Sequence, residues 1–451
     1  MAHKRIPVLI ILALLAGGPF AAAQEKRRLG LEEAVRLALE TSHALHASEM
    51  RREAAAARSR ETDAARLPAL RFGGGYARLS EVPPFEVSLP FPPLGSALSK
   101  FVVSPNYYNS FTLRLSLQQP VFTGFRLQSA AAMSRELERA AAHETTGDRR
   151  DLVYGVTAAY WNLVKAMELR AVLIENVSLI RAHLRDVENF REQGLLTMND
   201  TLRVKTQLAN AELMDLEAQD AVQVATTLLN SLTGLPLEAG LEPTTPVEAA
   251  AADAAALESA DLQSLSQRAK EGRPELRALG ARVRASDAGV TAAKSGWLPQ
   301  AFITGNYYHL RPNPRVMPAR DEFFGTWDLG VTVAFDVWNW GQTREQVSQA
   351  EAQRAQARDG LSLMEDQVVL EVTQAVLGLR QARQRIAAAG SAVGQAEENL
   401  RVTTDRFQEG VALSRDVLDA EVLLLQARTT RAQALADRAL AAARLRKAVG
   451  D

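Results

Sequence analysis

The residues of this chain with the clearest capacity for chemistry are aspartates in two similar stretches, residues 194–202 and 410–418. Each stretch begins with a glycine, continues with small or apolar residues, and places an aspartate six positions later, Asp200 or Asp416. Asp419 follows three residues after the second of these. A carboxylate just after a turn can accept hydrogen bonds from the first N–H groups of a helix and complement its dipole.

Other reactive side chains do not form a recognisable site. His43 and His46 are three residues apart, with Glu40 and Glu49 extending the row. Steps of three drift about 60° each around a helix, so at most two neighbours converge on one ion. The glycines at 73–75 lack the Lys-Ser/Thr of a phosphate loop. With 6 histidines and 0 cysteines, the sequence predicts no enzyme, no cofactor and no metal site.

Long helical patterns flank both aspartate stretches. Residues 126–190 carry apolar side chains at the three-and-four spacing of a coiled-coil seam. At about 1.5 Å per residue such a helix is a rod of roughly 95 Å. A second helical pattern covers residues 199–233 and stops at a Gly-Leu-Pro sequence. Each aspartate stretch is therefore predicted to be the tip of a helical hairpin.

The clearest strand pattern lies at residues 111–118, where apolar and polar side chains alternate. Pro120 and Gly124 are expected to close this strand. A shorter aromatic and glycine-rich run at residues 72–76 predicts a second strand. Between them, residues 80–110 contain six prolines, and we expect a long loop without secondary structure, which is usually functional or exposed.

The second half of the chain repeats this plan. A helical pattern begins near residue 262, is interrupted near Gly272, and is followed by predicted strands at 301–310 and 327–336. Gly341 matches Gly124 at an offset of 217, and Gly410 matches Gly194 at 216. A nearly constant offset indicates an internal duplication. We therefore expect a first repeat at 24–239, a linker at 240–258 and a second repeat at 259–451, each repeat having a helix, two strands and a long hairpin.

The first 23 residues have a basic start, an apolar run and a small-residue end. This pattern predicts a secretory signal peptide at residues 1–23. The formal net charge of the whole chain is −1 with mixed signs, which gives no general attraction to nucleic acid. No later stretch has the roughly eighteen uncharged apolar residues of a transmembrane helix.

Each half supplies two strands of about ten residues, enough to cross a bilayer when tilted. Taken alone, one such strand is equally typical of the edge of a soluble sandwich. Four strands cannot close a barrel, and an open edge in lipid leaves unpaired backbone groups that cost several kcal/mol each. The chain is therefore predicted to pool its strands with other copies; three copies give twelve strands in contact with membrane lipid.

The order helix, strand, strand, helix, tip, helix, present twice, resembles the TolC-like outer-membrane efflux ducts over essentially all of the mature chain. Residues 406–420 are similar to the second tip of that family. The resemblance implies a mixed α and β fold, in which a long α-helical coiled-coil barrel crosses the periplasm and a transmembrane β-barrel is completed by trimerisation, with four strands per chain and two internal structural repeats. It also implies tips that dock a periplasmic adaptor protein of an inner-membrane pump.

The resemblance further implies a periplasmic gate made by rings of aspartates, which correspond to Asp200, Asp416 and Asp419. A ring of like charges on a threefold axis favours cations. The alternative is that these aspartates only stabilise the first turn of a helix. The chain departs from the family at Phe407, where a tyrosine is often found, and at Ala412, where an arginine is sometimes found.

Contact with the adaptor is expected at four small or apolar tip residues, which are Gly194, Leu195, Gly410 and Val411. Small turn residues allow a partner helix to approach closely. The alternative is that the glycines serve turn geometry alone.

The function that follows is a passive outer-membrane exit duct of a tripartite efflux system, working with an adaptor and a pump. The outer-membrane component of type I protein secretion is an alternative within the same class. A periplasmic coiled-coil scaffold without a pore is the alternative from another class, although a scaffold has no use for amphipathic strands of bilayer length.

Overall fold

The structure is a computed structural model that describes residues 26–83, 85–88, 100–104, 106–247 and 260–450. The predicted signal peptide and residues 248–258 of the predicted linker lie outside the described residues. The described residues fall into two compact units. The first draws on Met1–Ser42, Arg150–Leu262 and Thr373–Ala448, and the second on His43–Arg149, Gln263–Val372 and Val449–Asp451.

Two pairs of long helices of matching length dominate the chain. Helices α3 (Arg126–Glu192) and α8 (Gln342–Gln408) have 67 residues each, and α4 (Met198–Thr233) and α9 (Ser414–Val449) have 36 each. The later helix of each pair begins 216 residues after the earlier one. The predicted rods and returning helices are confirmed, because an apolar seam continued over so many residues permits no other regular structure.

The turns before α3 and α8 correct one detail of the expected alignment. The helix starts place Trp340 opposite Gly124 and Gly341 opposite Phe125, so the match of the two glycines is wrong by one residue. Each turn uses two consecutive left-handed residues, with φ of 59° and 68° in the first turn and 55° and 81° in the second. Glycine occupies a different one of the two positions in each turn.

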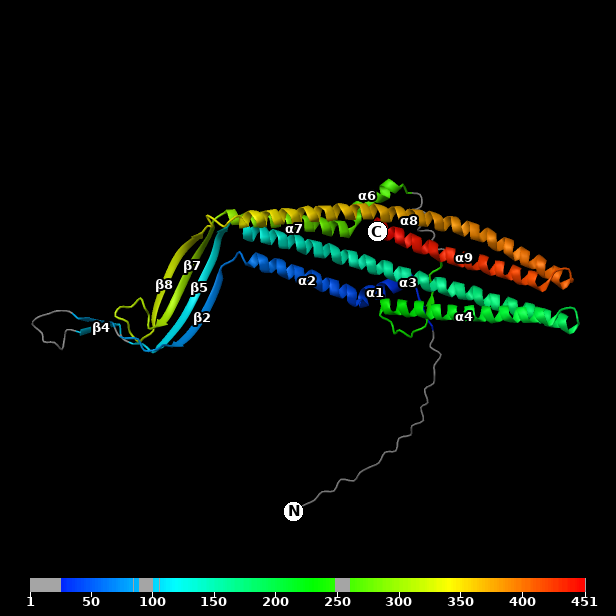
Figure 1. The fold of residues 1–451 in the computed structure, drawn as a ribbon, viewed down its shortest axis with the longest axis horizontal. Helices are drawn as coiled ribbons and strands as arrows, with labels where there is room; N and C mark the ends of the chain where they lie inside the picture. The colour runs from blue at the N-terminus through cyan, green and yellow to red at the C-terminus, as the bar shows by residue number, and fades with distance from the viewer. Residues whose placement is uncertain (1–25, 84, 89–99, 105, 248–259, 451) are drawn as a thin grey trace, which may run out of the picture. The chain divides into compact units, whose positions relative to one another are not determined.

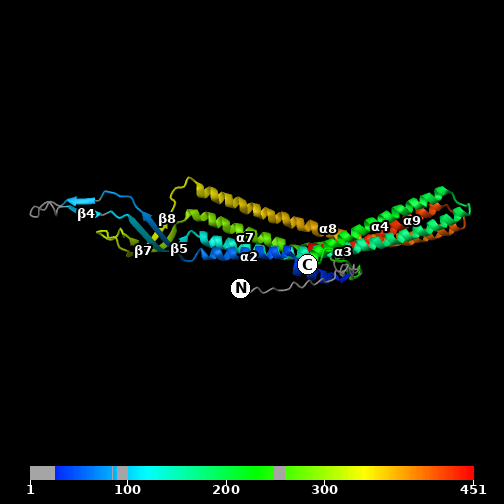
Figure 2. The ribbon, with the colours of Figure 1, turned by 90° about the horizontal axis from the view of Figure 1, so that it is seen from below.

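In the first unit, α3 packs against α4 and α9, and α9 packs against α8. Figures 1 and 2 show each pair side by side from two directions. Ion pairs that join these helices are Arg181–Glu212, Lys165–Asp437 and Arg428–Glu397. The main apolar cluster surrounds the buried side chains of Tyr160 and Trp161 on α3.

A short parallel strand pair, β1 (Arg27–Leu29) with β6 (Leu241–Pro243), closes the first unit next to α1 (Leu31–Thr41). The Tyr160 hydroxyl donates to the Leu29 carbonyl at 3.2 Å and accepts from the Thr245 N–H at 2.9 Å. The first residues of the predicted linker at 240–258 form β6, and the bounds of the linker stay a prediction. Three-residue strands pair through backbone groups and leave no periodic pattern in the sequence.

In the second unit the helices follow the order α2, α3, α7, α8. Helix α2 (His43–Ala64) contacts α3, α3 contacts α7 (Pro274–Lys294), and α7 contacts α8. The contacts include Ser48–Asp148, Arg284–Glu136 and Arg358–Asp287. Helix α1 ends at Ser42, whose extended backbone separates it from α2. Helix α6 (Leu262–Gly272) stops before α7, as predicted, and η1 (Ser295–Trp297) follows α7.

The four predicted strands form one antiparallel sheet in the order β2 (Ala69–Arg78), β5 (Asn109–Thr123), β7 (Gln300–Arg311), β8 (Phe324–Ala334). The strands lie side by side in Figure 1. Along the chain, β2 follows α2, β5 precedes α3, β7 follows α7, and β8 precedes α8. The strands therefore have the same order in the sheet as their helices have in the series above. Strand β5 continues past Pro120, where we expected it to end. The pairing with β7 shifts register at this proline, and a bulge tolerates a residue without an N–H.

The sheet has one apolar face and one polar face, set by the two-residue period of its strands. The apolar face carries exposed side chains on all four strands, including Leu70, Phe72, Leu113, Leu115, Leu117, Ile303, Tyr307, Trp327, Leu329 and Val331. The register places Thr112, Arg114, Ser116, Thr304, Asn306, Thr326 and Asp328 on the other face.

The region between β2 and β5 is not a loop without secondary structure. Strand β3 (Phe85–Ser88) pairs antiparallel with β4 (Lys100–Ser104). The expectation for residues 80–110 is wrong because most of the prolines lie between or outside these runs, which themselves contain Val and Phe. Among the described residues, no helix combines the length and the apolar character needed to cross a membrane.

Candidate functional site

The two hairpin tips have the same backbone geometry. Gly194 and Gly410 both have φ of 76°, a left-handed conformation that favours glycine. The N–H of Leu195 bonds to the Phe190 carbonyl at 2.9 Å, and the N–H of Val411 bonds to the Arg406 carbonyl at 2.8 Å. This hydrogen bond over five residues is typical of helices that end at glycine. The sequence prediction of a tip at each stretch is confirmed.

The residues after the two glycines present apolar side chains to solvent. Leu195 is 68% exposed and Val411 is 65% exposed. A side chain added at either glycine would meet no atom within 4 Å. The tips therefore have open space and apolar surface, which leaves the expected adaptor contact as a prediction.

Asp200 belongs to a complete capping box at the start of α4. Its carboxylate accepts from the Thr197 N–H at 3.0 Å and from the Thr197 hydroxyl at 2.6 Å. The Thr197 hydroxyl oxygen in turn accepts from the Asp200 N–H at 3.4 Å. The hydrogen bond from the Thr197 side chain, followed by the one from its backbone, lowers the pKa of Asp200. Asp200 is therefore ionised at neutral pH and caps its helix.

Asp416 has the equivalent position in α9, but its cap is incomplete. Its carboxylate accepts from the Leu413 N–H at 3.0 Å. Leu413 has no hydroxyl to return a hydrogen bond, unlike Thr197 in the first tip. Asp416 also lies 3.5 Å from the guanidinium of Arg415. Asp419 is exposed one turn further along α9. Helix capping thus accounts for two of the three candidate gate residues, Asp200 and Asp416.

A contact between the hairpins was not predicted from the sequence. His183 of α3 and Ser414 of α9 are both buried, and their Nε2 and Oγ atoms are 3.0 Å apart. Burial lowers the pKa of His183, against smaller raising effects of Ser414 and Asp186. The signal was a histidine on the apolar seam of α3, between Ile180 and Val187. A polar residue there needs a partner, but its spacing does not identify that partner.

Phe407 lies in the apolar cluster beneath the tips. It is 3% exposed and makes edge contacts with the rings of His183 and Phe190 at 5.2 and 5.3 Å. The first and second hairpins are therefore joined by apolar packing at this position, and the His183–Ser414 contact supplies the polar link. A tyrosine hydroxyl at position 407 would need its own buried partner.

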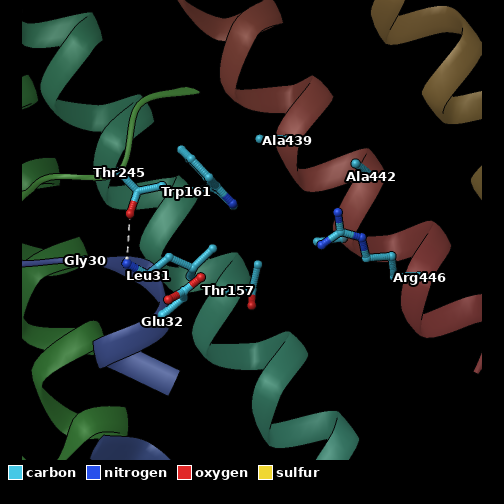
Figure 3. Close-up of a pocket in the computed structure, with 10 residues that line it drawn as sticks. Gly30, Leu31, Glu32, Thr157, Trp161, Thr245, Ala439, Ala442 and Arg446 are labelled. Atoms are coloured by element: carbon cyan, nitrogen blue, oxygen red, sulfur yellow. Dashed lines mark hydrogen bonds between the residues drawn. The ribbon is translucent and has the colours of Figure 1, made fainter. Parts of the chain in front are cut away.

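A pocket of about 360 Å³ lies in the first unit between α3, α9 and the chain around Gly30 (Figure 3). Its walls include Trp161 and Ala439, and Arg446 extends its guanidinium from α9 toward the space. The N–H of Leu31 donates to the Thr245 hydroxyl at 2.9 Å. The ten lining residues include no histidine or cysteine, so the pocket has no nucleophile paired with an imidazole base.

In the described part of the chain, no group of three or more His, Asp or Glu side chains is placed to hold a metal ion. His43, His46, Glu40 and Glu49 stay distributed along α1 and α2.

The architecture is that of outer-membrane channels of known structure. The chain is similar to CusC, with a TM-score of 0.78, 18% identity, and coverage of 99% of this chain and 96% of that one. It is also similar to VceC of Vibrio cholerae, with a TM-score of 0.76, 20% identity, and coverage of 93% and 96%.

The family is shown by sequence as well. The model of the outer membrane efflux protein family matches residues 34–235 and 265–451, and the chain belongs to this family. A relative is the outer membrane efflux protein BepC of Brucella suis biovar 1 (strain 1330), 24% identical over 354 residues, which cover 76% of this chain and 73% of BepC. The protein is therefore an outer-membrane efflux protein, and its class is that of transport ducts.

Proposed function

We propose that three copies of this chain form a passive exit duct, which crosses the outer membrane, extends into the periplasm and works with a periplasmic adaptor and an inner-membrane pump. The observation that carries the proposal is the four-stranded sheet with one exposed apolar face. In this proposal the energy for transport comes from the pump.

The trimer is supported by the edges of the sheet. Among the described residues, β2 and β8 are each hydrogen-bonded to one neighbouring strand only. In lipid, each unpaired backbone group costs several kcal/mol. Pairing β8 of one copy with β2 of the next removes these edges, and three copies then give a barrel of twelve strands. The apolar face of this barrel contacts lipid, and the polar face surrounds water.

An internal duplication explains the matching helices. The equal lengths of α3 and α8, and of α4 and α9, with the uniform shift of 216 residues, support descent of both halves from one unit. The shared order of strands and helices in the second unit supports a wall in which each strand continues into its own helix.

The gate is proposed at Asp200, Asp416 and Asp419. The capping hydrogen bonds of Asp200 and Asp416 hold these carboxylates at the helix starts. On a threefold axis each of them becomes a ring of three charges, which favours cations and repels anions. Docking of the adaptor is proposed at Gly194, Leu195, Gly410 and Val411, supported by the two exposed apolar side chains.

The test is single-channel conductance of the purified trimer in a planar bilayer. Asp200, Asp416 and Asp419 are changed together to asparagine, which keeps an oxygen for the capping hydrogen bonds and removes the charge. We expect small cation-selective currents for the wild type and larger, less selective currents for the variant. Asp220→Asn, an exposed residue on α4, is the control and should resemble the wild type.

The outcomes separate the parts of the proposal. Equal currents from all three proteins overturn the gate and leave the duct. Trimers that insert without conducting, or a protein recovered only as a soluble monomer, overturn the duct.

A second experiment tests docking of the adaptor. The double variant Leu195→Asp with Val411→Asp should reduce co-purification of the adaptor while conductance is retained. Unchanged recovery of the adaptor would contradict docking at these residues.

A further inference from the structure

The polar face of the sheet carries two arginines that share one aromatic ring. The Arg114 guanidinium lies 5.4 Å from the centre of the Tyr308 ring, and the Arg315 guanidinium lies 6.0 Å from it. Arg114 is on β5, and it pairs directly with Tyr308 on β7. Arg315 comes from the connection between β7 and β8, and its guanidinium lies near the same Tyr308 ring. The strands that this connection joins are shown in Figure 1.

The position of Arg315 is built by a buried asparagine. Asn313 is 0% exposed, and its side-chain oxygen Oδ1 accepts from the Arg315 backbone N–H at 2.9 Å. Its side-chain nitrogen Nδ2 donates to the Phe324 carbonyl at 3.0 Å and to the Thr326 hydroxyl at 3.1 Å. Arg315 also donates to the Trp327 carbonyl at 3.0 Å. These bonds fix the backbone and the side chain of Arg315 against β8.

The charges on this face do not balance. Asp328 lies 3.6 Å from Arg315 and accepts from the Asn306 amide at 2.8 Å. Arg114 donates to the neutral Asn306 oxygen, at 2.8 and 3.2 Å, so its own charge has no carboxylate partner among the described residues. Arg71 of β2 is exposed on the same face, where the register pairs it with Ser116. Three guanidinium groups therefore accompany one carboxylate on the described strands and on the part of the connection that contacts them.

We propose that Arg71, Arg114 and Arg315, here called the lumen arginine cluster, form a binding site for anionic groups of solutes that pass through the barrel. This inference rests on the proposed trimeric duct, in which the polar face lines the water-filled lumen. Guanidinium groups bind carboxylate and phosphate groups through paired N–H donors. Each chain contributes two positive charges in excess of Asp328, so three copies surround a lumen with six.

The field of such a ring reaches a passing solute. Screening at physiological salt has a length of about 8 Å, so the cluster acts on a solute that passes within that distance of the arginines. Neutral solutes and monovalent cations gain nothing from the cluster, while a solute with several anionic groups contacts more than one arginine. The site thus binds anionic cargo inside the barrel.

The test uses inositol hexakisphosphate as the probe, added to either compartment of a planar bilayer that holds conducting trimers. We expect it to block the wild-type channel from one compartment. In the double variant Arg114→Gln with Arg315→Gln, the blocking concentration should rise at least tenfold. Asp328→Asn removes the carboxylate that lies 3.6 Å from Arg315 and should lower the blocking concentration, so the proposal can be tested by a change of either sign.

Arg78 provides a matched control on the opposite face of the sheet. It donates to the Asn109 side-chain oxygen at 2.9 Å and lies 5.0 Å from the Tyr108 ring centre, which are the same kinds of contact that Arg114 makes. Arg78→Gln should leave the block unchanged. An equal block in wild type, the double variant and Asp328→Asn overturns the cluster, and so does a conducting wild-type channel that the probe does not block. If no trimer conducts at all, the proposed duct fails and the cluster fails with it.

Discussion

The Nε2 atom of His183 lies 3.0 Å from the hydroxyl oxygen of Ser414, and this contact links the first hairpin to the start of α9. The two residues are separated by 231 positions in the chain. Ser414 is the first residue of α9, two positions before Asp416. The packing of α3 against α9 therefore has a direct effect on the placement of a proposed gate residue.

Acidification should loosen this link. Burial lowers the pKa of His183, so the folded state favours the neutral ring. The neutral His183 ring therefore contributes its full stability to the folded state above the pKa of about 6.5 that histidine has in the unfolded chain. This contribution is lost as the pH falls below that value and through the lower pKa of the folded state. Asp186 is the nearby acid that opposes this effect. The chain has 0 cysteines, so spin labels can be attached to single cysteines introduced at residues 195 and 411. The distance between the two labels should have a broader distribution at pH 5 than at pH 7.5.

Two variants check the assignment to His183. His183→Gln keeps a hydrogen-bonding group without a titration in this range, and it should remove most of the pH dependence. His143→Gln, on α3 in the second unit, should leave it unchanged. A pH response that persists in His183→Gln would contradict the role of this side chain.

The unequal caps predict opposite effects of two substitutions. Thr197→Ala removes the hydroxyl half of the first capping box and should destabilise the start of α4 by about 0.5–2 kcal/mol. Leu413→Thr supplies the missing hydroxyl in the second tip at a side chain that is 58% exposed, and it should stabilise the start of α9 by a similar amount. Hydrogen exchange of the first turns, measured by mass spectrometry, distinguishes the two. Equal exchange of the two turns in the wild type would show that the hydroxyl contributes nothing.

Glu421 should limit stability at neutral and alkaline pH. It is 5% exposed on α9, its Oε2 atom has no hydrogen-bond partner among the described residues, and burial raises its pKa to about 7. A raised carboxyl pKa means that stability is highest below about pH 4.5, falls as the pH rises to about 7, and is constant above it. Glu421→Gln should therefore stabilise the protein at pH 8, by at most about 3 kcal/mol, and have little effect at pH 4.

Thermal midpoints at the two pH values check this prediction, with Glu217→Gln at an exposed site of α4 as the control. A gain from Glu421→Gln that is the same at pH 4 and pH 8 would assign the effect to packing and not to ionisation.

The two faces of the sheet predict opposite tolerance of charge at neighbouring positions. Leu115→Arg places a charge on the proposed lipid face, where it costs about 2–4 kcal/mol near the bilayer centre. Ser116→Arg places the same side chain on the lumen face and should be tolerated. Heat-modifiable trimers in outer-membrane fractions should be lost for the first variant and kept for the second. Loss of trimers for Ser116→Arg alone would reverse the assignment of the faces.

The long helices and the four strands could be predicted because each is specified by a local, repeated pattern. An apolar seam that continues from Arg126 to Glu192, or an alternation such as that of residues 111–118, indicates one type of structure over its whole length. The β1–β6 pair and the β3–β4 hairpin were missed because very short strands have too few residues to show a period. Pro120 was misjudged because a bulge accepts a proline that a regular ladder excludes.

The candidate site was predictable to the same degree. Asp200 and Asp416 could be placed at helix starts, because glycine and the return of the helical pattern fix the turn. The difference between Thr197 and Leu413 was visible in the sequence, but its meaning required the hydrogen bonds. The His183–Ser414 contact depends on how two distant helices pack, and no spacing within either helix specifies it.

The two open edges and the exposed apolar face of the sheet have a consequence for biogenesis. A single folded chain is unstable in water, because its apolar face is exposed there. It is also unstable in lipid, because the backbone groups at its two sheet edges have no hydrogen-bond partners. Folding of the sheet and assembly of the proposed trimer should therefore occur together at the membrane. Before that moment, the open strand edges and the exposed apolar face of a single chain favour aggregation.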